Sequence, residues 1–223
     1  MATLYFRLNP HLYLRDPQQT ELGQKIISAS VRLIDTLGFE QFTFKKLAED
    51  IDSTEASVYR YFENKHRLLQ YLVGWYWTWL EYRIDLFTSS LPSPQEKLKA
   101  CIKVVASEKK FDDTFEFMDE EALHRIVVSE LDKTYLTKQV DSDNREGLFG
   151  GFKLLCKKIS AWVSEINPGY AYPHTLVSTI LLTAKHQIFF AEHLPSLTDL
   201  NNTTTRHQQL ETFLESLLIK TIT

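Results

Sequence analysis

The chain has 223 residues, of which 43% are hydrophobic, and it carries a formal net charge of −4. The length allows one large or two modest buried cores, and no uncharged apolar run reaches the ~18 residues that a membrane-spanning helix needs. The mild acidity argues against non-specific binding of nucleic acid through bulk charge, and residues 1–70 carry as many basic as acidic side chains. The N-terminus lacks the basic start and apolar stretch of a secretory signal, so we expect a cytoplasmic protein without a membrane partner.

Only 7 Gly and 7 Pro are present, which favours few turns and long helices. No strand-like alternation and no internal repeat appear, so we expect an all-α fold. Cys101 and Cys156 lie in helical patterns without CxxC spacing. They are compatible with two reduced core thiols or with a single disulfide between them.

The first 19 residues form an irregular arm, because Pro10 and Pro17 interrupt any helix there. Two interpretations of this arm are open. It is either a tail that packs on the rest of the protein, or an arm whose Arg7 and Arg15 reach a nucleic-acid backbone or minor groove.

Three helices are expected between residues 20 and 69. Residues 20–37 follow a helical period of apolar side chains, and Gly38 is placed to end that helix. Residues 43–65 then predict a short helix, a tight corner and a second short helix. Asp52 suits the left-handed backbone of the corner, and Thr54 is a good N-cap for the helix after it. This is the pattern of a helix-turn-helix.

A more specific pattern covers roughly the first third of the chain. It consists of Ile26-Ile27, Leu33, Leu37-Gly38-Phe39, Thr43, Leu47-Ala48, Val58-Tyr59, Tyr61-Phe62, Asn64-Lys65 and Leu68-Leu69. In these residues the chain resembles the N-terminal DNA-binding domain of the TetR family of bacterial transcriptional regulators. It departs from that family at the corner, where Asp52-Ser53 stands in place of Gly and an apolar residue, and at Glu55, where Lys or Gln is frequent.

The resemblance implies an arm at residues 1–19, a helix-turn-helix DNA-binding domain at 20–66 and a helical effector-binding and dimerisation domain at 67–223. It implies a sequence-specific transcriptional regulator, a ligand-responsive repressor, with no catalytic activity and no cofactor. Its partners would be a double-stranded DNA operator, a small-molecule effector, and a second copy bound through the two C-terminal helices.

Carried over position by position, the resemblance assigns these residues to DNA binding: Thr43, Lys45, Lys46, Glu55, Ala56, Ser57, Tyr59, Arg60, Tyr61 and Lys65. Hydroxyl groups and cations at the helix starts suit phosphates, while Ala56, Ser57 and Tyr59 would face base edges or the sugar-phosphate chain.

Three of these residues have alternative interpretations. Glu55 either stabilises its helix through the dipole or accepts a hydrogen bond from cytosine. Tyr59 and Tyr61 either contact DNA or are ordinary packing residues.

Residues 65–88 predict one long helix that links the DNA-binding unit to the body. Further helices are expected at 94–108, 115–131, 147–166, 172–193 and 204–221. Aromatic helix faces with a few polar anchors give a candidate ligand pocket, for which ordinary core packing is the alternative at each position: Trp75, Trp79, Phe115, His124, Phe152 and Gln187.

No motif supports a metal site or catalysis. His186 and His193 are seven residues apart, whereas metal-binding helices favour spacings of three or four. No nucleophile has a base beside it in motif form, and no glycine-rich phosphate loop is present. Two other classes of function remain open: an α-helical carrier of small molecules that keeps the helix-turn-helix only as structure, and an adaptor for a protein partner.

Overall fold

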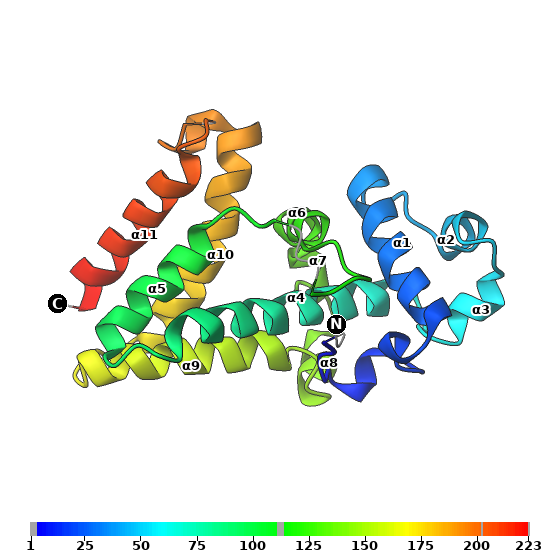
Figure 1. The fold of residues 1–223 in the computed structure, drawn as a ribbon, viewed down its shortest axis with the longest axis horizontal. Helices are drawn as coiled ribbons and strands as arrows, with labels where there is room; N and C mark the ends of the chain where they lie inside the picture. The colour runs from blue at the N-terminus through cyan, green and yellow to red at the C-terminus, as the bar shows by residue number, and fades with distance from the viewer. Residues whose placement is uncertain (1–3, 111–113, 202, 223) are drawn as a thin grey trace. The chain divides into compact units, whose positions relative to one another are not determined.

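The computed structural model describes residues 4–110, 114–201 and 203–222, and these residues form helices and connecting loops without a strand (Figure 1). The expected all-α fold is confirmed. The α-helices are α1 (Glu21–Leu37), α2 (Phe44–Asp50), α3 (Glu55–Tyr59), α4 (Lys65–Thr88), α5 (Pro94–Ala106), α6 (Glu120–Glu130), α7 (Asp132–Tyr135), α8 (Val140–Arg145), α9 (Gly150–Ile166), α10 (Pro173–His193) and α11 (Arg206–Ile222), and the 3-10 turns are η1 (Pro10–Leu12), η2 (Pro17–Gln19) and η3 (Pro195–Leu197). Among the described residues, none of the helices combines the length and apolarity needed to cross a membrane.

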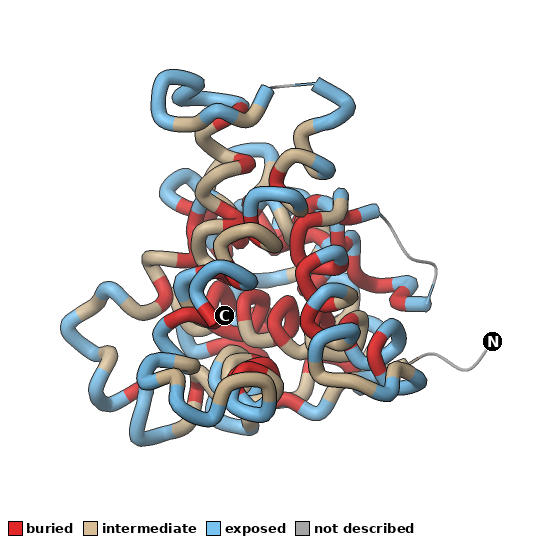
Figure 2. The backbone as a smooth tube through the Cα atoms, turned by 90° about the vertical axis from the view of Figure 1, so that its left-hand side faces the viewer, coloured by how far each residue is buried: buried red, intermediate tan, exposed pale blue. Residues whose placement is uncertain are grey.

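The chain divides into two compact units. Unit 1 combines Met1–Thr78 with Lys109–Gly151, and unit 2 combines Trp79–Glu108 with Phe152–Thr223. Helix α4 therefore begins in unit 1 and ends in unit 2. Buried stretches alternate with exposed ones along most helices in Figure 2, as expected for amphipathic helices that pack on one face. The domain boundaries drawn from the sequence stay a prediction.

The first three helices, α1 to α3, form what we call the reading head. Helix α1 buries Ile26, Ile27 and Ile34, each at most 2% exposed, and lies in Figure 1 between α6 on one side and α2 and α3 on the other. It ends as expected at Gly38, whose φ of 76° is left-handed and whose N–H donates to the carbonyl of Ile34.

The helix expected at 115–131 begins later, at Glu120. Phe115 and Phe117 are almost fully buried in the preceding loop, so their hydrophobicity reflects packing of an irregular segment rather than a helix face. Asp119 starts α6 instead, because its carboxylate accepts the N–H of Ala122.

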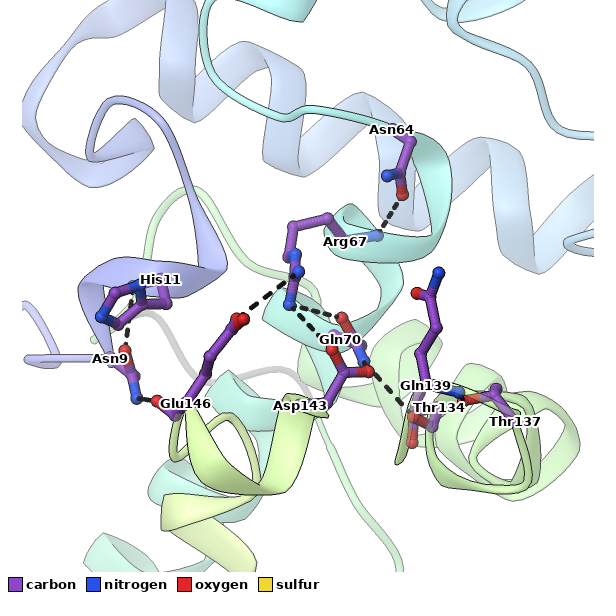
Figure 3. A network of polar contacts seen from close by, with 10 residues as sticks. All are labelled: Asn9, His11, Asn64, Arg67, Gln70, Thr134, Thr137, Gln139, Asp143 and Glu146. Carbon is purple, nitrogen blue, oxygen red and sulfur yellow. Dashed lines mark hydrogen bonds and ion pairs between the residues drawn. The ribbon is translucent and has the colours of Figure 1, made fainter. Parts of the chain in front are cut away.

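The polar run 141–145 lies outside the helices expected from the sequence, but it belongs to helix α8. Its stability comes from contacts with α4, which Figure 3 shows from close by. Asp143, 3% exposed, accepts a hydrogen bond of 2.7 Å from Gln70 Nε2 and lies 3.5 Å from the guanidinium of Arg67. Arg67 also approaches Glu146 at 3.8 Å.

Unit 2 packs the end of α4 with α5, α9, α10 and α11. Lys158 on α9 forms ion pairs with Glu81 and Asp85 on α4, at 2.6 and 2.7 Å. The helix expected at 147–166 begins at Gly150, because the chain turns at Gly147, where φ is 77°. Both cysteines are free thiols, and burial raises the pKa of Cys101 to about 12.

Candidate nucleic-acid interface

Local capping sets the geometry of the two short helices of the helix-turn-helix. Thr43 Oγ1 accepts the N–H of Lys46 at the start of α2, and Thr54 Oγ1 accepts the N–H of Ser57 at the start of α3, both at 3.2 Å. Between the helices, Asp52 has a φ of 53°, the left-handed conformation that a tight corner requires. The corner and the Thr54 cap agree with the sequence prediction.

One side of α2 and α3 is open to solvent. Beyond the buried Leu47 and Val58, the exposed side chains here include the following members of the predicted set: Thr43, Lys45, Lys46, Glu55, Ala56, Tyr59 and Arg60. Tyr59 is 48% exposed, and its ring packs edge-on against Phe44 at 5.0 Å. That contact orients a large amphipathic side chain outward from α3, as a group that reads a duplex requires.

Two members of the predicted set are turned inward. Ser57 is 9% exposed and forms hydrogen bonds with Thr54 Oγ1 at 3.0 Å and Arg60 Nη2 at 3.1 Å. Tyr61 is 2% exposed, and its hydroxyl is bonded to Thr20 Oγ1 at 2.8 Å. In this structure Tyr61 is a packing residue, and Ser57 links the start of α3 to Arg60.

Lys65 is bound to the protein's own backbone. Its ammonium lies 3.0, 3.2 and 3.1 Å from the carbonyl oxygens of Phe39, Glu40 and Phe42, and 4.8 Å from the centre of the Phe39 ring. Three acceptors match the three N–H donors of an ammonium group. Lys65 therefore holds the loop between α1 and α2 in place.

The sequence of this region matches a known protein family. The family model described as "Bacterial regulatory proteins, tetR family" matches residues 26–72, a range that contains α2, α3 and the start of α4. Residues 26–72 therefore carry the N-terminal domain of the TetR family. A search of curated proteins gives no significant match.

Solved structures of transcriptional regulators share the fold along most of the chain. A putative TetR-family regulator from Rhodococcus sp. has a TM-score of 0.63 at 12% identity, over 89% of this chain and 97% of its own. The fatty acid degradation regulator FadR from Bacillus halodurans has a TM-score of 0.60 at 18% identity, over 87% and 93%. The ketosteroid transcriptional regulator KstR2 of Mycobacterium tuberculosis has a TM-score of 0.57 at 15% identity, over 88% and 92%. At these identities the likeness establishes the fold.

The TetR-type reading head is fastened to α6 and α7 by ion pairs. Arg125 on α6 lies 2.8 Å from Asp35 on α1, and hydrogen bonding to Asp35 raises the pKa of the guanidinium. Lys133 lies 2.7 Å from Glu40 and 2.8 Å from Glu130, and these bonds, with Glu130 the larger cause, raise the pKa of its ammonium. Ion pairs thus hold both the end of α1, through Asp35, and the loop after it, through Glu40.

The predicted pocket residues are divided between the two units. In unit 1 the rings of Trp75 and Phe115 lie 5.1 Å apart, and His124 Nδ1 is hydrogen-bonded to Tyr76 Oη at 2.8 Å. The other three members of that set, Trp79, Phe152 and Gln187, belong to unit 2, where Gln187 Oε1 accepts a 2.6 Å hydrogen bond from Thr198. The structure brings Trp75 and Phe115 into ring contact, whereas His124 contacts Tyr76.

The N-terminal arm packs on the rest of the protein, as one of its two sequence interpretations holds, but its contact with these rings was not predicted. Phe6 packs against both Trp75 and Phe115 at 5.1 and 5.0 Å. An available signal was the density of aromatic residues in an irregular segment, which is unusual for a solvated tail. Within the described residues, no group of three or more His, Cys, Asp or Glu side chains is placed to hold a metal ion.

Proposed function

We propose that this protein is a ligand-responsive repressor that binds a DNA operator in the cytoplasm as a homodimer. The observation that carries the proposal is the exposed surface of α2 and α3, where Lys45, Lys46 and Tyr59 stand outward from a buried core. A short helix presented in this way enters the major groove by its N-terminal end, with cations placed toward the flanking phosphates.

The surface of the last two helices supports a homodimer. On α11, Phe213 and Ile219 are 45% and 41% exposed, and on α10 Phe189 and Phe190 are half-buried. Apolar side chains left on the surface of paired helices are typical of subunit interfaces. In a symmetric dimer, two reading heads would contact half-sites about one turn of B-DNA apart, ~34 Å.

Helix α4 provides a route for a ligand response, because it runs from the reading head's unit into unit 2. A ligand that favours the spacing unable to bind DNA by ~2–3 kcal/mol would release much of the operator.

The test is fluorescence anisotropy with DNA that flanks the protein's own gene, after genomic footprinting has located a site. We expect tight binding by the wild type, with affinity that falls as salt rises. Tyr59→Ala should weaken binding by tenfold or more, on the scale of ~1–3 kcal/mol for one specific contact. Tyr172→Ala, an equally truncated tyrosine that is 66% exposed in unit 2, is the matched control and should bind as the wild type does. Equal binding by both variants would exclude α3 as the DNA-contacting element.

The alternative classes predict different results in the same assay. A carrier of small molecules that keeps the helix-turn-helix only structurally would show neither affinity for the flanking DNA nor a salt dependence. An adaptor that uses the C-terminal helices for another protein would be a monomer in size-exclusion chromatography.

A further inference from the structure

The N-terminal arm, residues 4–19, is fitted closely to unit 1. It bends at η1 and η2, each capped by a side chain, and Leu12 at the end of η1 is 2% exposed. Gly23 on α1 makes room for the second bend, because a Cβ atom there would lie 2.2 Å from the carbonyl oxygen of Pro17. At its middle the arm is tied to α8's end through Asn9 Nδ2, which donates to the carbonyl of Glu146 at 2.8 Å. The arm is therefore a docked part of the structure and not a loose tail.

The arm inserts one aromatic ring into unit 1. The rings of Phe6, Trp75 and Phe115 form a triangle with centroid distances of 5.0 to 5.1 Å. Trp75 and Phe115 are completely buried, whereas Phe6 is half-buried and comes from a segment without regular structure. We call the space beside Trp75 and Phe115 that Phe6 fills the aromatic slot. If the arm withdrew, Phe6 would leave the aromatic slot, whereas Trp75 and Phe115 would stay in place.

Two buried donors on this part of α4 have no acceptor among the described residues. Trp75 Nε1 and Tyr71 Oη, one helical turn apart, find no hydrogen-bond partner among the described residues. The ring of Tyr13 from the arm lies 6.1 Å from that of Tyr71, and Phe6 from the arm lies 5.1 Å from Trp75, so both side chains contact the arm. Burying an unsatisfied donor is unfavourable, and each such group in a folded protein calls for an explanation.

We propose that the aromatic slot binds a planar aromatic molecule that carries a hydrogen-bond acceptor, a carboxylate or carbonyl, and that Phe6 occupies the slot as an internal plug until such a molecule displaces it. The ligand's ring would stack where Phe6 lies, and its acceptor would satisfy Trp75 Nε1 or Tyr71 Oη. The proposal rests on the proposed function, because it assigns a chemical class to the effector of the proposed repressor.

The other end of the arm explains how displacement would reach the DNA-binding surface. Leu14 N–H donates to the carbonyl of Tyr61 at 2.8 Å, Arg15 lies 5.5 Å from the centre of the Tyr61 ring, and Thr20 bonds the Tyr61 hydroxyl. Tyr61 directly follows α3 and its cap. Withdrawal of Phe6 loosens an arm that is anchored at the end of α3, and DNA affinity falls.

The slot is tested by calorimetry on the full-length protein without DNA, with 1-naphthoate as the probe. Phe6→Ala should bind 1-naphthoate at least tenfold more tightly than the wild type, because no plug has to be displaced. Tyr5→Ala is the matched control: Tyr5 is the neighbouring arm aromatic and stacks on Phe117, outside the triangle, so its loss should change affinity less than twofold. Equal affinity of the wild type and Phe6→Ala, or no binding to either, overturns the proposal.

The acceptor is tested by comparing 1-naphthoate with 1-methylnaphthalene, which has the same ring without the carboxylate. Trp75→Phe and Tyr71→Phe each remove a donor and keep an aromatic ring, and Tyr71→Phe keeps the core volume almost unchanged should the tryptophan variant fail to fold. At least one of these variants should bind 1-naphthoate tenfold more weakly than the wild type and bind 1-methylnaphthalene with unchanged affinity. Equal effects on both probes, or none, would overturn the assignment of the donors.

The link to DNA is read separately by adding 1-naphthoate to the protein–operator complex. Release of DNA from the wild type is expected. Probe binding without release overturns the coupling through Tyr61 and leaves the slot standing. If the wild type binds no operator, the proposed function fails while the calorimetric result still decides the slot.

Discussion

Lys65 shows how one side chain's contacts decide between two roles that its sequence position allows. The resemblance implies that this lysine binds a DNA phosphate, but its ammonium already has three backbone acceptors in the loop between α1 and α2. An ammonium has three donors, so a phosphate contact would require breaking one of these bonds. The structure thus favours a positioning role, with Lys65 shaping the loop that precedes α2.

The dependence of operator affinity on salt separates the two roles. Each phosphate contact that is lost lowers the slope of log K against log salt by about 0.9. We predict that Lys65→Met weakens operator binding without changing this slope and lowers the free energy of unfolding by about 2 kcal/mol, since three carbonyls lose a charged donor. Lys45→Met, at an exposed position on α2, should lower the slope and leave stability within ~0.5 kcal/mol. A slope that falls equally in both variants would restore the phosphate role to Lys65.

Residue roles that depend on neighbours in sequence were predictable, and roles that depend on distant partners were not. The Thr54 cap, the left-handed Asp52 and the terminal Gly38 follow from local backbone rules. The burial of Tyr61 depends on Thr20, 41 residues earlier in the chain. No periodicity in the sequence encodes that contact.

At the scale of elements, the least predictable helix was α8. Its sequence around Asp141 to Arg145 is polar and has no apolar stripe, so periodicity cannot identify it. The helix exists because Asp143 points into unit 1 and meets Arg67 and Gln70 on α4 (Figure 3). A buried, bonded carboxylate here takes the place of the apolar anchor that the sequence pattern requires.

Removal of that carboxylate should separate α8 from α4. We predict that Asp143→Ala lowers the free energy of unfolding by about 2–3 kcal/mol, because Gln70 loses its 2.7 Å acceptor and Arg67 loses its nearest carboxylate. Arg67 then keeps Gln70 Oε1 at 3.1 Å and the more distant Glu146 as partners. Asp141→Ala, on the exposed side of the same helix, controls for helix propensity and should cost less than ~0.5 kcal/mol. Urea unfolding monitored by tryptophan fluorescence measures both; similar losses would show that the network contributes little.

At the scale of the whole molecule, the sequence was sufficient for the fold class and for the order of the long helices. It did not show that residues 109–151 are packed together with the reading head in unit 1. That grouping depends on ion pairs across long stretches of chain, such as Arg125 with Asp35 and Lys133 with Glu40. It also depends on the arm, whose aromatic rings contact Tyr71 and Trp75 on α4 and Phe115 before α6. Local patterns carry no information on which distant charges meet.

The assembly proposed for the molecule depends on the surface of α11. Phe213 on that helix is 45% exposed, and Leu154 on α9 is 59% exposed. Both are exposed apolar side chains of unit 2, but they lie on different helices. We predict that Phe213→Asp converts a dimer into a monomer, because a carboxylate would be desolvated at the interface between the two copies. Leu154→Asp, which introduces the same charge in the same unit, should leave the dimer intact. Multi-angle light scattering after size-exclusion chromatography gives the mass of each variant.

The monomer should also bind a full operator more than tenfold more weakly than the wild type, because two linked heads act at a high effective concentration. Dimeric Phe213→Asp together with monomeric Leu154→Asp would move the interface from α11 to α9.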